Sequence, residues 1–279
     1  MSKLSYGTSP ELSINKAKIV ILPVPYDKTS TWIKGSDKGP KAILEASKVL
    51  ENYDIETDSQ AFKKGIFTED EIIEKGLPEK MVDKVKNKVL SLIDDKKFVV
   101  TIGGEHSVAI GSMQAHAERY KDITILQLDA HADLQQEYHG SKYNHGCVMA
   151  RVNDLCNIVQ IGIRSMDTKE KKEMNKENVF FAKDIVKDAK WTDKVVSKLS
   201  KNVYITIDAD VFDPSIMPST GTPEPGGLGW YEVLRLLKKV IAKKNLVGFD
   251  FVELCPKKEN KAPDFMAAKL IYKVLSYKF

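Results

Sequence analysis

The chain has few cysteines, no long apolar run and no large excess of one charge. Its 279 residues include only 3 cysteines, Cys147, Cys156 and Cys255, none in Cys-x-x-Cys spacing. This argues against a disulfide framework and a thiolate zinc site, so we expect reduced, mostly buried thiols. Lys and Arg number 43 against 39 Asp and Glu, a formal net charge of +4. Because the lysines do not gather with aromatic residues into a stripe, nucleic acid is not an expected partner.

Membrane and leader signals are also missing. No apolar stretch approaches the roughly 20 residues that span a bilayer, and residues 1–7 contain no apolar signal core. We therefore expect a cytoplasmic protein with no membrane partner. Hydrophobic residues make up 42% of the chain, and no Ser/Gly/Pro-rich linker or internal repeat divides it. We predict a single domain covering residues 1–279.

Short β-rich runs alternate with longer helical patterns, and residues 51–77 give mixed signals. The predicted strands are 17–22, 98–102, 123–128, 158–163, 179–181, 203–207 and 246–254. The predicted helices are 40–50, 78–93 with a buried stripe of Val82, Val85, Val89 and Ile93, 107–120, a helix from 147, 168–176, 183–199, 230–243 and 262–278. This alternation predicts a parallel sheet covered on both faces, with ligands at the carboxyl ends of the strands.

Two acidic clusters follow two of these strands. The segment Asp129-Ala-His-Ala-Asp133 places three potential metal ligands at alternate positions. If strand geometry continued that far, the three side chains would share one face, where the carboxylates would repel each other strongly without a cation. Further along, a second apolar strand runs into Asp208-Ala-Asp210. We predict that the two clusters are halves of one metal site.

All 5 histidines lie between residues 106 and 145. His106 follows Gly-Gly at a predicted strand-to-helix turn, where a side chain is presented to a ligand, so a ligand role is favoured. Position alone leaves His145 open between catalysis and structure. His116, inside a predicted helix, is expected to be a surface or core residue. His139, in a polar loop, is expected to be solvated or at most a rim residue.

Three motifs now occur together and in order: Gly-Gly-Glu-His106-Ser, Asp129-Ala-His-Ala-Asp133 and Asp208-Ala-Asp210-Val-Phe-Asp-Pro214. With them, the chain resembles the ureohydrolases, the arginase and agmatinase family, over nearly its whole length. The resemblance implies a three-layer α/β/α fold with a central, mainly parallel eight-stranded sheet. It also implies two manganese ions per subunit and a homo-oligomer, a trimer or a hexamer.

The resemblance assigns the metal ligands residue by residue. One manganese would be held by His106, Asp129, Asp133 and Asp208, and the other by His131, Asp129, Asp208 and Asp210. Asp129 and Asp208 would therefore bridge the two ions. An oxygen-rich set with only two imidazoles suits Mn²⁺.

The same resemblance implies a mechanism. A hydroxide that bridges the two ions would attack the guanidinium carbon of a small-molecule substrate and release urea and an amine. Asp133 would orient the hydroxide, Glu253 would bind the guanidinium, and His145 would contact the substrate and carry protons to the leaving amine.

The loop Gly221-Thr-Pro-Glu224-Pro-Gly-Gly227 looks like the agmatinase form, and an added acid at Glu224 suits a second cationic amine. We therefore predict hydrolysis of agmatine to putrescine, a step of polyamine biosynthesis, with Glu224 in substrate binding. The alternatives are another ureohydrolase of the arginase, guanidinobutyrase or formimidoylglutamase type, and a non-catalytic metal-binding regulatory subunit.

Overall fold

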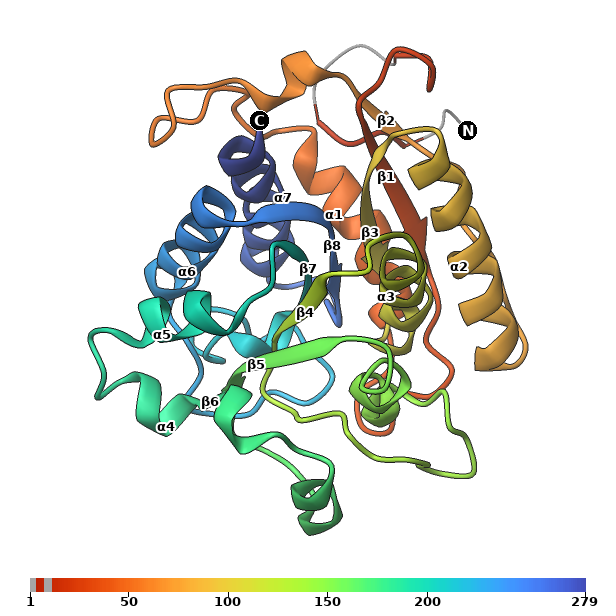
Figure 1. Cartoon of the computed structure of the whole chain (residues 1–279). Coiled ribbons are helices and arrows are strands. Elements are labelled where there is room, and N and C mark those ends of the chain that lie inside the picture. The colour runs from red at the N-terminus through yellow and green to blue at the C-terminus, as the bar shows by residue number, and fades with distance from the viewer. Residues whose placement is uncertain (1–3, 8–11) are drawn as a thin grey trace.

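A computed structural model describes residues 4–7 and 12–279, which form one eight-stranded sheet flanked by helices (Figure 1). The prediction for residues 1–7 falls partly on residues 1–3, outside the described residues. All neighbouring strands pair in parallel, in the order β2-β1-β3-β8-β7-β4-β5-β6. The strands are β1 (Ile19–Val24), β2 (Ile66–Thr68), β3 (Phe98–Gly103), β4 (Ile123–Leu128), β5 (Asn157–Ile163), β6 (Val179–Phe181), β7 (Asn202–Asp208) and β8 (Asn245–Val252).

Helices cover both faces of the sheet and give three layers (Figure 1). One face is packed by α2 (Pro78–Asp94) and α3 (Ser107–Arg119). The other face is packed by α1 (Gly39–Ser47), α5 (Trp191–Lys198), α6 (Trp230–Lys243) and α7 (Ala262–Lys278), with the short helix α4 (Ala182–Ile185) beside β5 and β6. The predicted three-layer α/β architecture is confirmed.

The apolar strands are buried on both sides, which is why they read as continuous hydrophobic runs. In β1, Ile19 and Ile21 pack into the core under α1, α6 and α7. The intervening Val20 and Leu22 pack into the core under α2 and α3. Alternation along each strand thus ties the two helical layers to one sheet.

Several element boundaries agree with the sequence patterns, and others were wrong. The ranges predicted for β6, α6 and α7 match residue for residue. The first strand, predicted as 17–22, instead covers Ile19–Val24 and includes Pro23. Within α2 the buried stripe ends on Leu92, because Ile93 is partly exposed. The three-residue strand β2 was missed in the mixed segment 51–77.

Three predicted helices were also wrong. The helix predicted from Cys147 is a pair of 3-10 turns, because the amide N–H groups of Met149 and Ala150 donate back to the carbonyl of Asp133 at 2.9 and 3.3 Å. The range 168–176 contains only a 3-10 helix, Thr168–Lys172. The range 183–199 is split into α4 and α5 by a turn in which the Asp188 side chain accepts the Lys190 N–H.

The strands β3, β8, β7 and β4 are consecutive neighbours in the middle of the sheet. Because they are parallel, their carboxyl ends meet at one edge. The predicted site residues begin at these four ends. Among the described residues, no helix is both long and apolar enough to cross a bilayer.

Candidate active site

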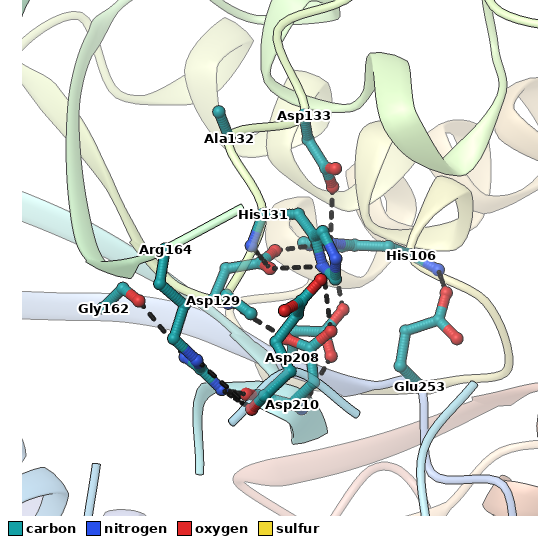
Figure 2. A network of polar contacts seen from close by, with 12 residues as sticks. His106, Asp129, His131, Ala132, Asp133, Gly162, Arg164, Asp208, Asp210 and Glu253 are labelled. Carbon is teal, nitrogen blue, oxygen red and sulfur yellow. Dashed lines mark hydrogen bonds and ion pairs between the residues drawn. The ribbon is translucent and has the colours of Figure 1, made fainter. Parts of the chain in front are cut away.

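Each of the four central strands delivers one or more site residues as it ends (Figure 2). Asp208 is the last residue of β7, and Asp129 directly follows β4. Glu253 follows β8, and His106 stands just before α3 in the turn that follows β3. Asp208, Asp129 and His106 are buried and Glu253 is half-buried, so the chain brings several charged groups into a space with little water.

The Asp129-Ala-His-Ala-Asp133 segment does not continue the strand, so the strand geometry that we assumed for a shared face of its three ligands was wrong. Strand β4 ends at Leu128, and Asp133 adopts a φ of 54°, in the left-handed region. Glu253 has a φ of 63°. Such conformations cost about 1–3 kcal/mol each in non-glycine residues and gather at functional sites. The ligands nevertheless converge, because the chain turns around the site.

The first cluster of donors surrounds His106. Its Nδ1 lies 3.0 Å from Asp129 Oδ2, 3.0 Å from Asp133 Oδ2 and 3.4 Å from Asp208 Oδ2. Atoms of His106, Asp129 and Asp208 lie close enough to hold one ion together. Asp133 completes the set that was predicted for the first metal.

The second cluster shares Asp129 with the first. His131 Nδ1 lies 2.9 Å from Asp210 Oδ2 and 3.7 Å from Asp129 Oδ1. Backbone hydrogen bonds orient the carboxylates, since Asp129 Oδ1 accepts the His131 N–H at 2.6 Å and Asp208 Oδ1 accepts the Asp210 N–H at 2.9 Å. Asp129 is thus common to both groups, as predicted for a bridging ligand. The second predicted bridge, Asp208, appears in the first group only.

Charge crowding shifts the pKa values of these groups. Burial raises the pKa of Asp133 to about 7, and the charge of Asp129 adds to the effect. Burial, followed by the charges of Asp210 and Asp129, holds the pKa of Asp208 well above its ordinary value. Burial opposes protonation of His106, but contacts with Asp129 and Asp133 outweigh it and raise its pKa. A cluster that retains protons in this way is one that a divalent cation would stabilise.

The hydrogen bonds of His106 fit a metal ligand. Its Nε2 lies 2.9 Å from Thr206 Oγ1, and that hydroxyl donates to Asp250 Oδ1 at 2.7 Å. Nε2 must therefore be the donor, so Nδ1 is the nitrogen that faces the carboxylates and that would bind an ion once it has lost its proton. This buried Nδ1 has no hydrogen-bond partner in the described part of the chain. An imidazole fixed through its other nitrogen is the usual form of a metal-bound histidine.

A cavity of about 220 Å³ opens over the two clusters. The predicted residues that line it are His106, His131, Asp133, His145, Asp208, Asp210 and Glu253. Glu253 Oε1 accepts the His106 N–H at 2.6 Å. Burial, and then the charge of Glu105, raises the pKa of Glu253 well above its ordinary value. A cationic group beside it would reverse this shift.

Glu224 does not line this cavity. Its carbonyl oxygen accepts a hydrogen bond from Arg164 Nη2 at 2.9 Å. The same nitrogen donates to the Asp210 carbonyl at 2.5 Å (Figure 2). Arg164 therefore braces the loop that contains Glu224 against the metal-binding segment. Sequence reasoning missed this arginine, because a lone Arg after a strand carries no spacing signal.

Further lining residues were missed, among them Trp32, Gln135, Asp167 and Glu170. Asp167 and Glu170 cap the 3-10 helix Thr168–Lys172, and their i, i+3 spacing was a readable capping signal. Trp32 is 76% exposed at the cavity, in the loop that follows β1. Together these residues add an aromatic ring, an amide and two carboxyl groups to the cavity lining that the motifs did not reveal.

The remaining predictions concern residues outside the clusters. His116 is a core residue whose Nδ1 lies 2.8 Å from the Ser112 carbonyl, and burial lowers its pKa to about 4. His139 is exposed and does not line the cavity. The three cysteines are free, and only Cys156 is partly exposed, as predicted.

The fold and site together define a class, a parallel α/β protein with two adjoining His/Asp groups that could each hold a metal ion at the carboxyl edge of its sheet. A sequence model of the Arginase family matches residues 17–276, and the chain belongs to that family of binuclear metal enzymes. It is 37% identical to an N(1)-aminopropylagmatine ureohydrolase of Synechocystis sp., over 94% of this chain and 89% of that protein.

It is also 31% identical to an agmatinase of Pyrococcus horikoshii, over 95% of this chain and 94% of that protein. Among solved structures, an agmatine ureohydrolase of Thermoplasma volcanium superposes with a TM-score of 0.91 at 33% identity, covering 100% of this chain and 95% of that one. The chain is therefore a hydrolase of the ureohydrolase type, as predicted, and a guanidino compound fits it as substrate.

Proposed function

We propose that this protein, as a single catalytic domain, uses two manganese ions to release urea from agmatine or an aminopropyl derivative of agmatine. The lining of the cavity carries the proposal. Besides the proposed metal ligands it contains three carboxyl groups, Asp167, Glu170 and Glu253, and no Lys or Arg from the described part of the chain. Such a lining favours a guanidinium with a cationic tail and disfavours a substrate that carries a carboxylate.

The metal assignment rests on the donor set. Two imidazoles and four carboxylates, with no thiolate, favour Mn²⁺ over a soft thiophilic ion. Two divalent cations bound at this site would supply an activated water for attack on the guanidinium carbon. Asp133, which contacts His106 at the cavity, is placed to accept a hydrogen bond from that water.

Glu253 is the proposed guanidinium anchor. Its Oε1 is occupied by the His106 N–H, whereas Oε2 makes no hydrogen bond with the described residues and is available to the substrate. A buried carboxylate that accepts guanidinium N–H groups fixes the plane of a delocalised, poorly electrophilic group.

His145 is the proposed proton carrier. It lines the cavity, and burial lowers its pKa to about 4, so that the imidazole is neutral near pH 7. A neutral imidazole can take a proton from the attacking water and return it to the leaving amine.

The test is urea release by the manganese-loaded protein with agmatine, N(1)-aminopropylagmatine, arginine and 4-guanidinobutyrate at equal concentrations. We expect kcat/KM to be highest for the first two compounds. Preference for arginine or 4-guanidinobutyrate would overturn the specificity. Absence of urea with every compound, at full metal content, would overturn the catalytic proposal in favour of a binding protein.

A specific observation favours N(1)-aminopropylagmatine as the second candidate beside agmatine. The aminopropyl arm adds a cation beyond the tail of agmatine, and the cavity opening offers the Asp167 carboxyl and the exposed Trp32 ring. A ring face and a carboxylate both attract an alkylammonium. Trp32→Ala and Asp167→Asn should raise KM more for the aminopropyl compound than for agmatine, whereas equal effects on both would argue against this contact.

Assembly and location are part of the same proposal. We expect a trimer or hexamer in the cytoplasm, and the molar mass from light scattering after size exclusion tests the assembly.

A further inference from the structure

The loop between β1 and α1 lies against the site through close backbone packing. The Glu105 N–H donates to the Tyr26 carbonyl at 2.8 Å, and a Cβ at Gly104 would lie 2.1 Å from that same oxygen. Only glycine at 104 permits this approach. The result is that Thr29 and Ser30 stand directly over the Glu105 side chain.

Glu105 is a fully buried carboxyl group that accepts hydrogen bonds from its surroundings. Its Oε2 accepts the N–H groups of Thr29 at 2.5 Å and Ser30 at 3.0 Å. Its Oε1 accepts the hydroxyls of Thr29 at 2.6 Å and Ser107 at 2.5 Å. Four donors converge on two oxygens, which is the pattern of a carboxylate that acts only as an acceptor.

The Thr29 hydroxyl is consequently committed as a donor. Its single hydrogen points to Glu105, so its oxygen can only accept from other groups. Two nitrogens of His145 approach that oxygen, the backbone N–H at 3.0 Å and the ring Nδ1 at 3.3 Å. Nδ1 must therefore carry the ring hydrogen.

We propose that Glu105 is a positioning residue that, through the Thr29 hydroxyl, holds His145 with Nδ1 protonated and with the lone pair of Nε2 available to the cavity. This inference rests on the proposed function, in which His145 carries a proton. The carrier step then occurs at Nε2: an N–H bond forms there as an O–H bond of the attacking water breaks. The same proton leaves Nε2 for the departing amine, so no proton is gained or lost over the cycle.

The Glu105–Thr29–His145 arrangement resembles the carboxylate–histidine pair of other active sites, with the Thr29 hydroxyl oxygen placed between the carboxylate and the ring. A carboxylate that accepts from Nδ1–H fixes the tautomer of a catalytic imidazole and stabilises the imidazolium that forms transiently. Here the carboxylate acts through a hydroxyl, because Glu105 is already used to hold the loop. The wrong tautomer would present an N–H to the cavity, where it could not accept a proton.

Thr29 offers a matched pair of variants. Thr29→Val keeps the shape of the side chain and the backbone N–H bond to Glu105 but removes the hydroxyl. Thr29→Ser keeps the hydroxyl. We expect the Val variant to lower kcat by about 10- to 100-fold, as for loss of a general acid or base. Its KM and bound manganese should stay within error of the wild type, and its melting temperature should fall because Glu105 loses a donor. The Ser variant should retain the wild-type melting temperature and most of kcat.

The tautomer itself can be read without turnover. In protein labelled with ¹⁵N-histidine and loaded with diamagnetic Zn²⁺, protonated and unprotonated ring nitrogens have well-separated shifts, and a His145→Asn spectrum assigns the signal. We expect Nδ1–H in the wild type and in Thr29→Ser, and a shift toward Nε2–H in Thr29→Val.

Several results would overturn the inference. Nε2–H in the wild type would do so without any variant, even if Thr29→Val failed to fold. Unchanged kcat in Thr29→Val, or equal losses of metal and activity in both variants, would leave Thr29 a structural residue only. Absence of urea from the wild type together with the Nδ1–H signal would instead reject the proposed function and leave the tautomer assignment standing.

Discussion

The crowded carboxylates make the stability of the metal-free protein depend on pH, and the shifted pKa of Asp133 gives the size of this dependence. Its pKa rises from the model-peptide value of 3.8 to about 7 in the folded state because of burial and the charge of Asp129. Between these two values the unfolded chain has lost the proton that the folded chain keeps. Stability therefore falls as pH rises from about 4 to 7. A difference of about 3 in pKa, at 1.36 kcal/mol for each, amounts to about 4 kcal/mol.

The assay is urea unfolding in EDTA at pH 5 and pH 8. About 3 kcal/mol of the Asp133 effect falls in this window, since the ionisation is completed near pH 7. The raised pKa values of His106 and His131 act in the same direction, because their protonated forms are favoured by folding and are lost at high pH. We expect the wild type to be less stable at pH 8, and Asp133→Asn to show a smaller difference between the two pH values.

Asp213→Asn is the matched control. The Asp213 side chain accepts hydrogen bonds from Ser215, Gly226 and Gly227 and so stabilises a turn. The Ser215 bonds are the first cause of a pKa lowered to about 2. The Asp213 carboxylate is fully ionised by pH 5, so its stabilising effect is the same at both pH values. Asp213→Asn should therefore lower the unfolding free energy by the same amount at pH 5 and at pH 8. Saturating Mn²⁺ should reverse the wild-type trend, since ligands must be deprotonated to bind. Equal stability of the metal-free wild type at pH 5 and pH 8 would refute the reasoning.

Three further predictions test the site directly. Asp129→Ala should bind neither manganese ion, because this carboxylate is common to both groups of ligands. Full metal content of the variant in elemental analysis would show that Asp129 does not bridge the two ions. Glu253→Gln should keep its manganese and lose kcat by more than about 100-fold, so an active variant would reject the guanidinium anchor. Arg164→Met should weaken manganese binding and lower the unfolding free energy by about 1–3 kcal/mol, since the carbonyls of Asp210 and Glu224 lose a charged donor. Unchanged metal affinity would show that Arg164 does not support the metal-binding segment.

The metal groups could be predicted from the sequence because their signal is local. Asp208 and Asp210 follow an apolar run, and the carboxyl ends of parallel strands share one edge, so two such runs place their acids together. The spacing did not predict the backbone. Asp133 leaves strand geometry, and its carbonyl accepts two N–H groups from the first turn of the helix predicted from Cys147.

The residues that sequence reasoning missed act singly and across long separations. Arg164 reaches the Glu224 carbonyl 60 positions away, and Thr29 reaches Glu105 76 positions away. Neither residue type has a periodicity or a motif that would report such a contact. Glu224 shows the opposite error, because its motif suggested a role for its carboxyl group, whereas the structure shows a contact through its carbonyl oxygen.

The site also explains where the chain departs from regular geometry. Two of the five described non-glycine residues with positive φ are Asp133 and Glu253, one after each of two central strands. A strand that continued past β8 would alternate its side chains across the sheet and carry Glu253 away from the cavity. The left-handed turn instead lets Glu253 Oε1 reach the His106 N–H at 2.6 Å, and its N–H donates to the Gly104 carbonyl at 2.7 Å. Because these contacts offset the strain, the guanidinium anchor is held ready before substrate arrives.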